Sequence, residues 1–114
     1  TPSSLAQHQE EWAKVIKAWD MAVAYLNDES TRDEAISIMA ARVGLSPDEY
    51  KGFIDGTKIM STKEAMAFAE KADGFTSIYG SSKIADDFNV ANDVYKDAQP
   101  IDSYIDMSLM KAAN

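Results

Sequence analysis

The sequence predicts an all-α fold of about five to six short helices, and three observations lead to that prediction. Apolar residues recur at helical spacing in the longest segment, three later segments begin with helix-capping sequences, and glycines stand where helices would end. No stretch shows the sustained alternation of a half-buried strand. The 114 residues are enough for one core, so we expect a single helical domain over residues 1–114.

The first predicted helix runs from about Leu5 to Asn27. Its apolar positions recur mostly at steps of three and four, which places them on one face of a helix. They are Trp12, Val15, Ile16, Trp19, Val23 and Leu26. The two tryptophans are therefore expected on one buried stripe. His8, the only histidine, is expected to be an exposed residue near the mobile start of the chain.

Three later helices are expected to begin at capping boxes. In a capping box a hydroxyl accepts a hydrogen bond from the backbone three residues on, and a glutamate there reaches back to the cap. The three boxes are Thr31 to Glu34, Ser46 to Glu49 and Ser61 to Glu64. Each should stabilise its helix by about 1 kcal/mol.

Glycines predict where these helices end. Gly44 and Gly56 fit left-handed caps at helix C-termini, where glycine carries no steric penalty. Asp73-Gly74 is expected to close the helix that carries Met66 and Phe68. The short stretch 57–60 could be briefly extended.

The second half of the chain has a weaker pattern. A fifth helix is predicted from Phe75 through Phe88, with Gly80-Ser81-Ser82 either bending it or starting it. Residues 89–99 fit a helix or a loop equally well, and Pro100 ends whatever precedes it. Residues 102–105 are expected to be irregular, so the structure of 89–106 stays open. A last short helix is predicted from about Met107 to Ala113.

Composition excludes several classes of protein. The net charge is −8 and the pI about 4.4, so nucleic acid and anionic membrane surfaces would repel the chain. The absence of cysteine removes disulfides, thiolate catalysis and cysteine-based zinc sites. No apolar run approaches the roughly 18 residues of a membrane span. The chain opens with Thr1 and Pro2 rather than with methionine, which suggests a processed chain or part of a longer one.

Adjacent carboxylates are the main candidates for acid–base chemistry. They are Asp86-Asp87 and Glu10-Glu11, but neighbours on a helix point about 100° apart and do not form a pair. We interpret them as a solvated acidic surface. Asp102 and Asp106 would share a face only if that segment were helical.

No other arrangement of residues indicates catalysis or metal binding. The calcium-loop spacing, the phosphate-binding glycine loop and the serine nucleophile elbow are all missing from the sequence. We therefore predict no catalytic residue, no metal, no cofactor and no enzymatic activity for the chain by itself. The large aromatic residues are expected to be core, namely Trp12, Trp19, Phe53, Phe68, Phe75 and Phe88.

One stretch carries a resemblance. Residues 15–50 read VIKAWDMAVAYLNDESTRDEAISIMAARVGLSPDEY. This resembles the C-terminal part of solute-binding proteins of ABC importers of the nitrate/sulfonate/taurine type, which include relatives that bind thiamine precursors. The shared features are a helix similar to "AW..AV.YL", then "EAI.IMA", then a "G.SP.EY" break. Phe53 to Glu64 looks similar to the family's next segment, and Ile105 to Ser108 with Ala112 looks similar to its tail.

The resemblance implies a two-lobed α/β parent, extracytoplasmic and either freely periplasmic or lipid-anchored. A small solute would bind between its lobes and a membrane permease would recognise the closed form. This chain would supply late helices that cover one lobe. Most ligand contacts would lie in the N-terminal part, so ligand-binding residues are unknown here. By itself the chain would expose the Trp12/Trp19 face, which dimerisation or rearrangement could bury.

The sequence also allows two other classes of function. One is a stand-alone helical protein-interaction module that docks a partner helix in a groove. The other is an enzyme with an unrecognised site, which is the weakest because a nucleophile, its base and metal ligands are all lacking.

Overall fold

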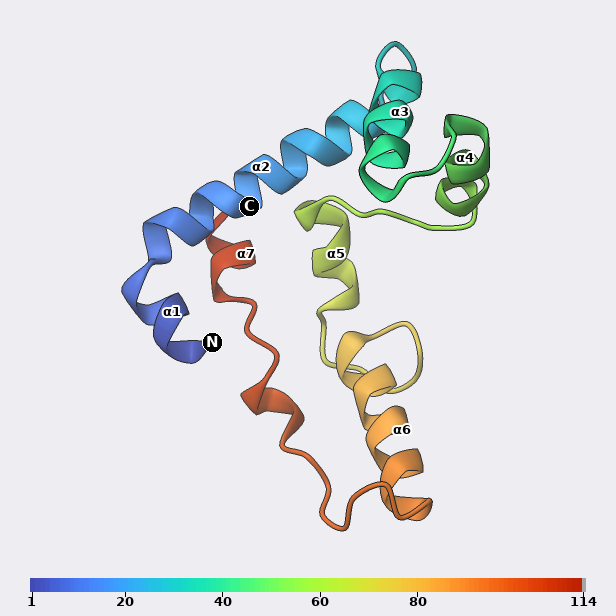
Figure 1. Ribbon diagram of the computed structural model, residues 1–114. Helices are drawn as coiled ribbons and strands as arrows, with labels where there is room; N and C mark the ends of the chain where they lie inside the picture. Colours follow the sequence, from blue (N-terminus) through green and yellow to red (C-terminus); the bar gives the residue numbers. More distant parts are fainter. Residues whose placement is uncertain (114) are drawn as a thin grey trace. The chain divides into compact units, whose positions relative to one another are not determined.

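The computed structural model describes residues 1–113, and all of its regular structure is helical (Figure 1). The elements are α1 (Pro2–Gln7), α2 (Gln9–Asn27), α3 (Arg32–Val43), α4 (Pro47–Asp55), α5 (Thr62–Phe68), α6 (Ile78–Ala91), the 3-10 helix η1 (Ile101–Ser103) and α7 (Ser108–Ala113). The all-α prediction is confirmed. The number of helices is larger than predicted, mainly because one expected helix is divided in two.

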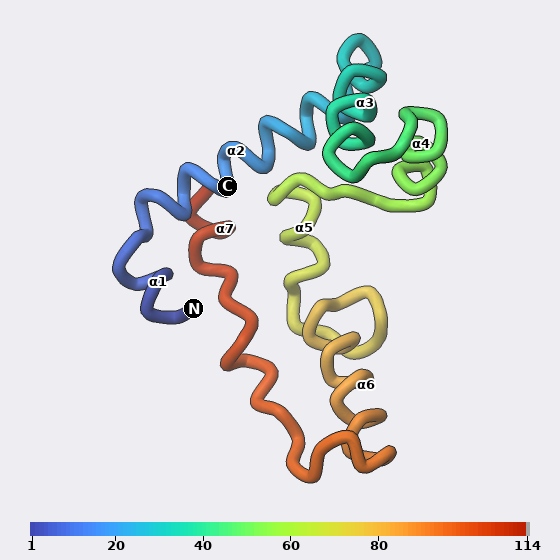
Figure 2. Tube along the Cα trace, in the orientation of Figure 1, coloured from blue at the N-terminus to red at the C-terminus, as the bar shows by residue number. Residues whose placement is uncertain are grey.

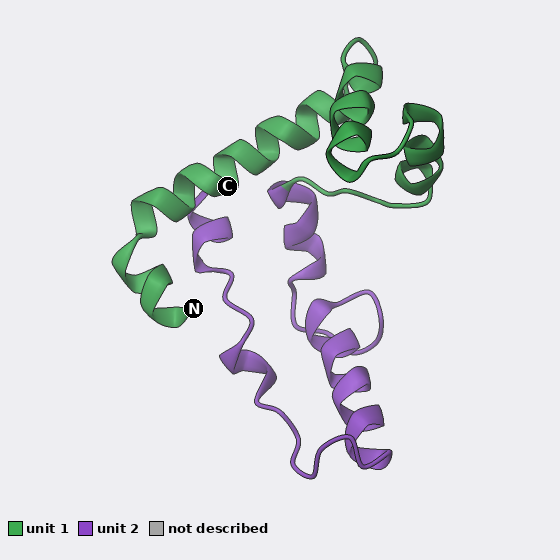
Figure 3. Ribbon diagram, in the orientation of Figure 1, with its two compact units in different colours: residues 1–61 green, residues 62–114 purple. Residues whose placement is uncertain are grey.

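The chain divides into two compact units, which are described separately (Figure 3). Unit 1 comprises residues 1–61 and contains α1 to α4. Unit 2 comprises residues 62–114 and contains α5, α6, η1 and α7. The path of the chain through each unit can be followed in the tube trace (Figure 2). The expectation of a single domain stays a prediction.

The helix predicted from Leu5 to Asn27 is interrupted at His8, so that prediction was wrong at its start. Thr1 caps α1 by accepting a 3.2 Å hydrogen bond from Ser4 N–H, with Pro2 in the first helical position. His8 then leaves the helical region, with φ −129° and ψ 40°, and α2 begins at the next residue. His8 is exposed, as predicted.

Unit 1 is held by an apolar cluster where α3 packs against both α2 and α4 (Figure 1). The buried members are Leu26, Ala35, Ile36 and Ile54, with Met39, Tyr50 and Ile59 packed against them. Burying a large aliphatic side chain stabilises a fold by about 1.5–3 kcal/mol. This cluster therefore provides the main stabilisation of the α2–α4 arrangement.

The sequence between α3 and α4 has both of the predicted caps. Gly44 is left-handed at φ 75°, and Leu45 N–H donates to Ala40 O at 3.0 Å, the longer-range bond of a Schellman motif. Ser46 then starts α4 with a complete capping box. Its hydroxyl accepts from Glu49 N–H at 3.4 Å, and its own N–H donates to the Glu49 carboxylate at 3.0 Å.

Two predicted caps of unit 1 were wrong. Thr31 precedes α3 but makes no capping bond, because its hydroxyl donates backward to Tyr25 O at 2.6 Å. Its expected partner Glu34 instead accepts a hydrogen bond from the Tyr25 hydroxyl. Gly56 is right-handed at φ −87°, because a tight turn from Thr57 N–H to Ile54 O ends α4 without a left-handed residue.

In unit 2, α5 begins directly after Ser61, at the predicted position, but ends at Phe68 rather than at Asp73-Gly74. Residues 69–77 form turns that lead into α6. Ser77 caps α6 by accepting from Tyr79 N–H and Gly80 N–H, so Gly80-Ser81-Ser82 lies in its first turns and Phe75 lies outside it. Ser77 Oγ donates to Glu70 O at 2.6 Å and accepts from Ala72 N–H at 3.4 Å, so these backbone groups bond to the residue that caps α6 and do not continue α5.

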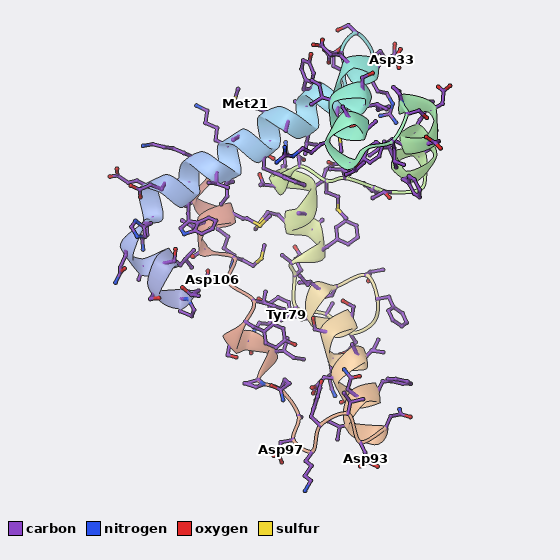
Figure 4. The ribbon with its side chains drawn as sticks, viewed as in Figure 1. Met21, Asp33, Tyr79, Asp93, Asp97 and Asp106 are labelled. Carbon is purple, nitrogen blue, oxygen red and sulfur yellow. The ribbon has the colours of Figure 1, made fainter. Side chains whose placement is uncertain are left out.

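The structure also settles the segment that the sequence left open. Residues 89–91 complete α6, whereas 92–100 have no regular structure. Asp93, at φ 57°, lies in the turn that follows α6 (Figure 4). After Pro100 the chain forms η1, so the expected irregular tail is partly a 3-10 helix.

The predicted aromatic core was wrong. All six residues are at least 38% exposed, and Phe75 is 80% exposed. Helical spacing places these side chains on particular faces, but it does not determine whether another element covers that face. In unit 1 the covered positions are occupied by aliphatic residues and alanine.

Candidate functional site

An apolar groove between α2 and α3 is the first candidate site, and it lies wholly within unit 1. It encloses about 260 Å³. Its walls include Trp19 and Tyr25 from α2, Ile38 and Met39 from α3, and Ile59 from the segment after α4. Trp19 is 50% exposed and Ile38 60% exposed, so solvent reaches the groove between them.

The two aromatic side chains of the groove have their polar atoms fixed by hydrogen bonds. Trp19 Nε1–H donates to Met60 O at 2.9 Å, and the Tyr25 hydroxyl donates to Glu34 Oε2 at 2.7 Å. The bond to Glu34 raises the pKa of Tyr25 above its ordinary value. Because the polar atoms already have partners, the groove offers apolar ring surface. Such a surface suits an aliphatic or aromatic side chain and offers nothing for acid–base chemistry.

A second candidate lies in unit 2, where a cleft of about 540 Å³ opens beside the start of α6. Tyr79 extends from α6 on the side of η1 (Figure 4), and both contribute to the cleft. Lys71 forms an ion pair with Asp102, and its ammonium lies 5.0 Å from the centre of the Tyr79 ring. The remaining walls come from Lys83 and from the segment around Gln99.

The charges of this cleft balance one another. Two lysines, Lys71 and Lys83, and two aspartates, Asp73 and Asp102, line its walls. The hydrogen bond to Asp102 raises the pKa of Lys71, and the hydrogen bond to Asp87 raises that of Lys83. Both lysines are thus cationic and already paired.

Asp86 lies buried behind the cleft, and here the sequence interpretation was wrong. It was expected on a solvated acidic surface, yet it is 5% exposed. Its Oδ1 accepts from Gln99 N–H at 2.9 Å and from the Tyr95 hydroxyl at 2.7 Å. These two bonds hold the pKa of Asp86 below its ordinary value of 3.8, the bond from Gln99 contributing most. No periodicity could reveal this site, because both donors come from an irregular segment.

The other carboxylates named from the sequence do not meet in a site. Asp87 is exposed and pairs with Lys83, and Glu10 and Glu11 are exposed on α2. Asp102 and Asp106 do not share a helical face, because they lie in η1 and in the irregular segment before α7. Asp106 accepts from Ser108 N–H at 2.8 Å at the start of α7.

Within residues 1–113, no three or more histidine, cysteine, aspartate or glutamate residues are grouped so that they could hold a metal ion. No helix in the same part of the chain is both long enough and apolar enough to cross a bilayer. The absence of catalysis and of a cofactor stays a prediction. Comparison with protein-family models, with curated proteins and with solved structures found no match to this chain.

Proposed function

We propose that this chain is part of the extracytoplasmic solute-binding component of an ABC importer of the nitrate/sulfonate/taurine type. The observation that carries the proposal is the order of features from Val15 to Tyr50. The stretch similar to "AW..AV.YL" lies in α2, and the stretch similar to "EAI.IMA" lies in α3. The "G.SP.EY" break corresponds to the Gly44 cap and the Ser46 capping box that separate α3 from α4.

An exposed apolar face on α2 also supports the proposal. Trp12 is 38% exposed, Val15 54% and Trp19 50%, and these residues lie at helical spacing. A helix that covers a sheet in a larger protein would expose such a face when the sheet is not present. In this proposal the face packs in the parent lobe, and the isolated chain buries it by dimerising or rearranging.

The role of the chain in such an importer would be structural. Its helices would help to form one lobe of a protein that closes around a small solute, and the permease would recognise the closed state. Contacts to the solute would come from residues of the parent outside this chain. No residue here is therefore assigned to ligand binding, and the solute is not named.

The test is a thermal-shift screen on the protein encoded by the complete reading frame. The panel contains nitrate, taurine, alkyl and aromatic sulfonates, small aromatic acids and pyrimidines. A ligand at 100 times its Kd adds about 2.7 kcal/mol of stability, which is a readily measured shift. A shift confined to one compound class would support the proposal, and a flat response across the panel in a folded parent would contradict it.

A second candidate is a helical protein-interaction module, and the groove beside Trp19 is the observation that favours it. The probe is a synthetic amphipathic helical peptide with a leucine-rich face, titrated against the 114-residue chain. Ile38→Asp places a carboxylate in the groove and should abolish binding. Met21, which is 66% exposed on α2 and outside the groove (Figure 4), provides the control Met21→Asp. Equal binding by both variants would exclude the groove as the docking site.

A further inference from the structure

Asp86 is buried beneath the chain that follows α6, and its carboxylate in turn holds that chain by two hydrogen bonds. A carboxylate is costly to remove from water unless hydrogen bonds replace its hydration. Asp86, near the middle of α6, receives both of its bonds from residues nine and thirteen positions later. Without those residues in place its carboxylate would lose both protein donors. Without the carboxylate, Gln99 N–H and the Tyr95 hydroxyl would lose their shared acceptor.

Residues 92–103, which we call the strap, are also attached to α6 by a 3.3 Å hydrogen bond from Asn89 Nδ2 to the Tyr95 hydroxyl and by contacts of η1, but their other attachments are weak. Val94 is 64% exposed, and the segment has no regular structure before η1. At its start, Val94 N–H donates to Asn89 O at 2.9 Å, which fixes only the turn after α6. At its far end, Asp102 pairs with Lys71, but both side chains are about two-thirds exposed. An exposed ion pair contributes little to stability.

The strap also forms one wall of the cleft in unit 2. Gln99, Pro100, Ile101 and Asp102 line the cleft beside Lys71 and Tyr79. Gln99, whose N–H is held by Asp86, therefore belongs to both the attachment and the wall. Release of this residue would move the wall and leave α6 in place.

We propose that the strap is a hinged flap, that the carboxylate of Asp86 is its latch, and that opening of the latch moves this wall away and widens the cleft beside Tyr79. The hinge is the turn at Asp93, which has a left-handed backbone at φ 57°. Opening breaks the two hydrogen bonds to Asp86, the bond from Asn89 Nδ2 to the Tyr95 hydroxyl, the contacts of η1 with α6 and the exposed Lys71–Asp102 pair. It breaks no helical hydrogen bond of α6, so it can occur without unfolding the helix.

The test is amide hydrogen exchange of the 114-residue chain, read at Gln99 and across residues 92–103. Asp86→Ala removes the acceptor of both bonds. We expect it to accelerate exchange at Gln99 at least about tenfold, the size of effect for a lost bond to a charged group. Tyr95→Phe removes one donor and keeps the ring, so it should give a smaller acceleration in the same residues.

Asp87→Ala is the matched control, because Asp87 is the next residue of α6 but is exposed and pairs with Lys83 on the same helix. It should leave exchange across the strap unchanged. The amides of residues 80–90 report whether α6 itself has opened. The proposal is overturned if Asp86→Ala and Tyr95→Phe both exchange like the wild type at Gln99. It is equally overturned if α6 opens together with the strap in Tyr95→Phe.

Discussion

The two units of this chain differ in the kind of residue that each one buries. The strongly buried apolar residues among positions 1–113 all lie in unit 1, namely Val23, Leu26, Ala35, Ile36, Ala40 and Ile54. The buried polar residues of the same part of the chain all lie in unit 2, namely Thr62, Ser77 and Asp86. Unit 1 therefore depends on packing and unit 2 on directed hydrogen bonds. Loss of volume should damage the first most, and loss of a donor or acceptor the second.

The largest effect is expected from Ile36→Ala, which tests the packing of unit 1. Ile36 is 2% exposed in the apolar cluster, so truncation should leave a cavity and cost about 2–5 kcal/mol of unfolding free energy. Urea unfolding followed by tryptophan fluorescence reads this unit, because both tryptophans lie in it. The control is Ile38→Ala on the same helix, at 60% exposure, which should cost much less. Equal losses would mean that the cluster is not the core.

Gly80→Ala should have the next largest effect, and it tests whether unit 2 depends on close backbone approach. A Cβ at Gly80 would lie 2.6 Å from both Ala72 O and Gly74 N, and both are backbone atoms that cannot simply rotate away. Overpacking of this kind costs about 1–3 kcal/mol. Amide hydrogen exchange in α6, recorded as the temperature is raised, measures this loss of stability. The control Gly52→Ala meets nothing within 4 Å inside α4 and should stabilise its helix slightly.

Ser46→Ala tests whether unit 1 also depends on single hydrogen bonds. Loss of the capping box should cost about 1 kcal/mol, less than loss of the buried isoleucine. The hydroxyl and N–H of Ser46 hold the pKa of Glu49 below its ordinary value of 4.5. The variant should therefore raise the pKa of Glu49, which carboxyl-carbon NMR titration can follow. An unchanged Glu49 pKa would show that the box does not persist in solution.

The smallest effect is expected from lowering the pH, and it concerns amide hydrogen exchange in the strap of unit 2. The pKa of Asp86 is lowered in the folded chain, so its contribution is complete above its ordinary pKa of 3.8 and is lost as pH falls through the folded value. Exchange at Gln99, corrected for intrinsic rates, should accelerate only in strongly acidic solution. Asp86→Asn keeps an acceptor but cannot titrate in this range. A pH step that persists in this variant would assign the effect to another group.

The elements that could be predicted from the sequence are those whose signal is local. The Gly44 cap and the Ser46 box each depend on contacts within a few residues, and both were predicted correctly. The break at His8 was missed because Thr1 and Pro2 start a helix of their own. Thr31 has a capping sequence, yet its hydroxyl donates backward to Tyr25 O. The backbone of the preceding helix thus competes with the cap for this hydroxyl, and the sequence motif does not reveal which of the two wins.

The candidate sites were less predictable because they depend on contacts distant in sequence. Trp19 takes its partner from Met60, 41 residues away, and the groove it lines requires α2 and α3 to meet. Asp86 was interpreted as part of a solvated acidic surface, and only the return of the chain from Tyr95 to Gln99 buries it. Apolar periodicity indicates where helices form, but it contains no information about which polar residue a loop will cover.

The separation of buried apolar residues from buried polar residues has a consequence for the heat capacity. Exposure of apolar surface on unfolding raises the heat capacity, whereas exposure of polar surface lowers it. Unit 1 should therefore have a strongly curved stability profile that weakens on cooling, and unit 2 a flatter one. Calorimetry of the chain should then resolve two components, with the larger heat-capacity change per residue belonging to unit 1. In the cold, unit 1 should loosen first, although it contains the larger apolar core.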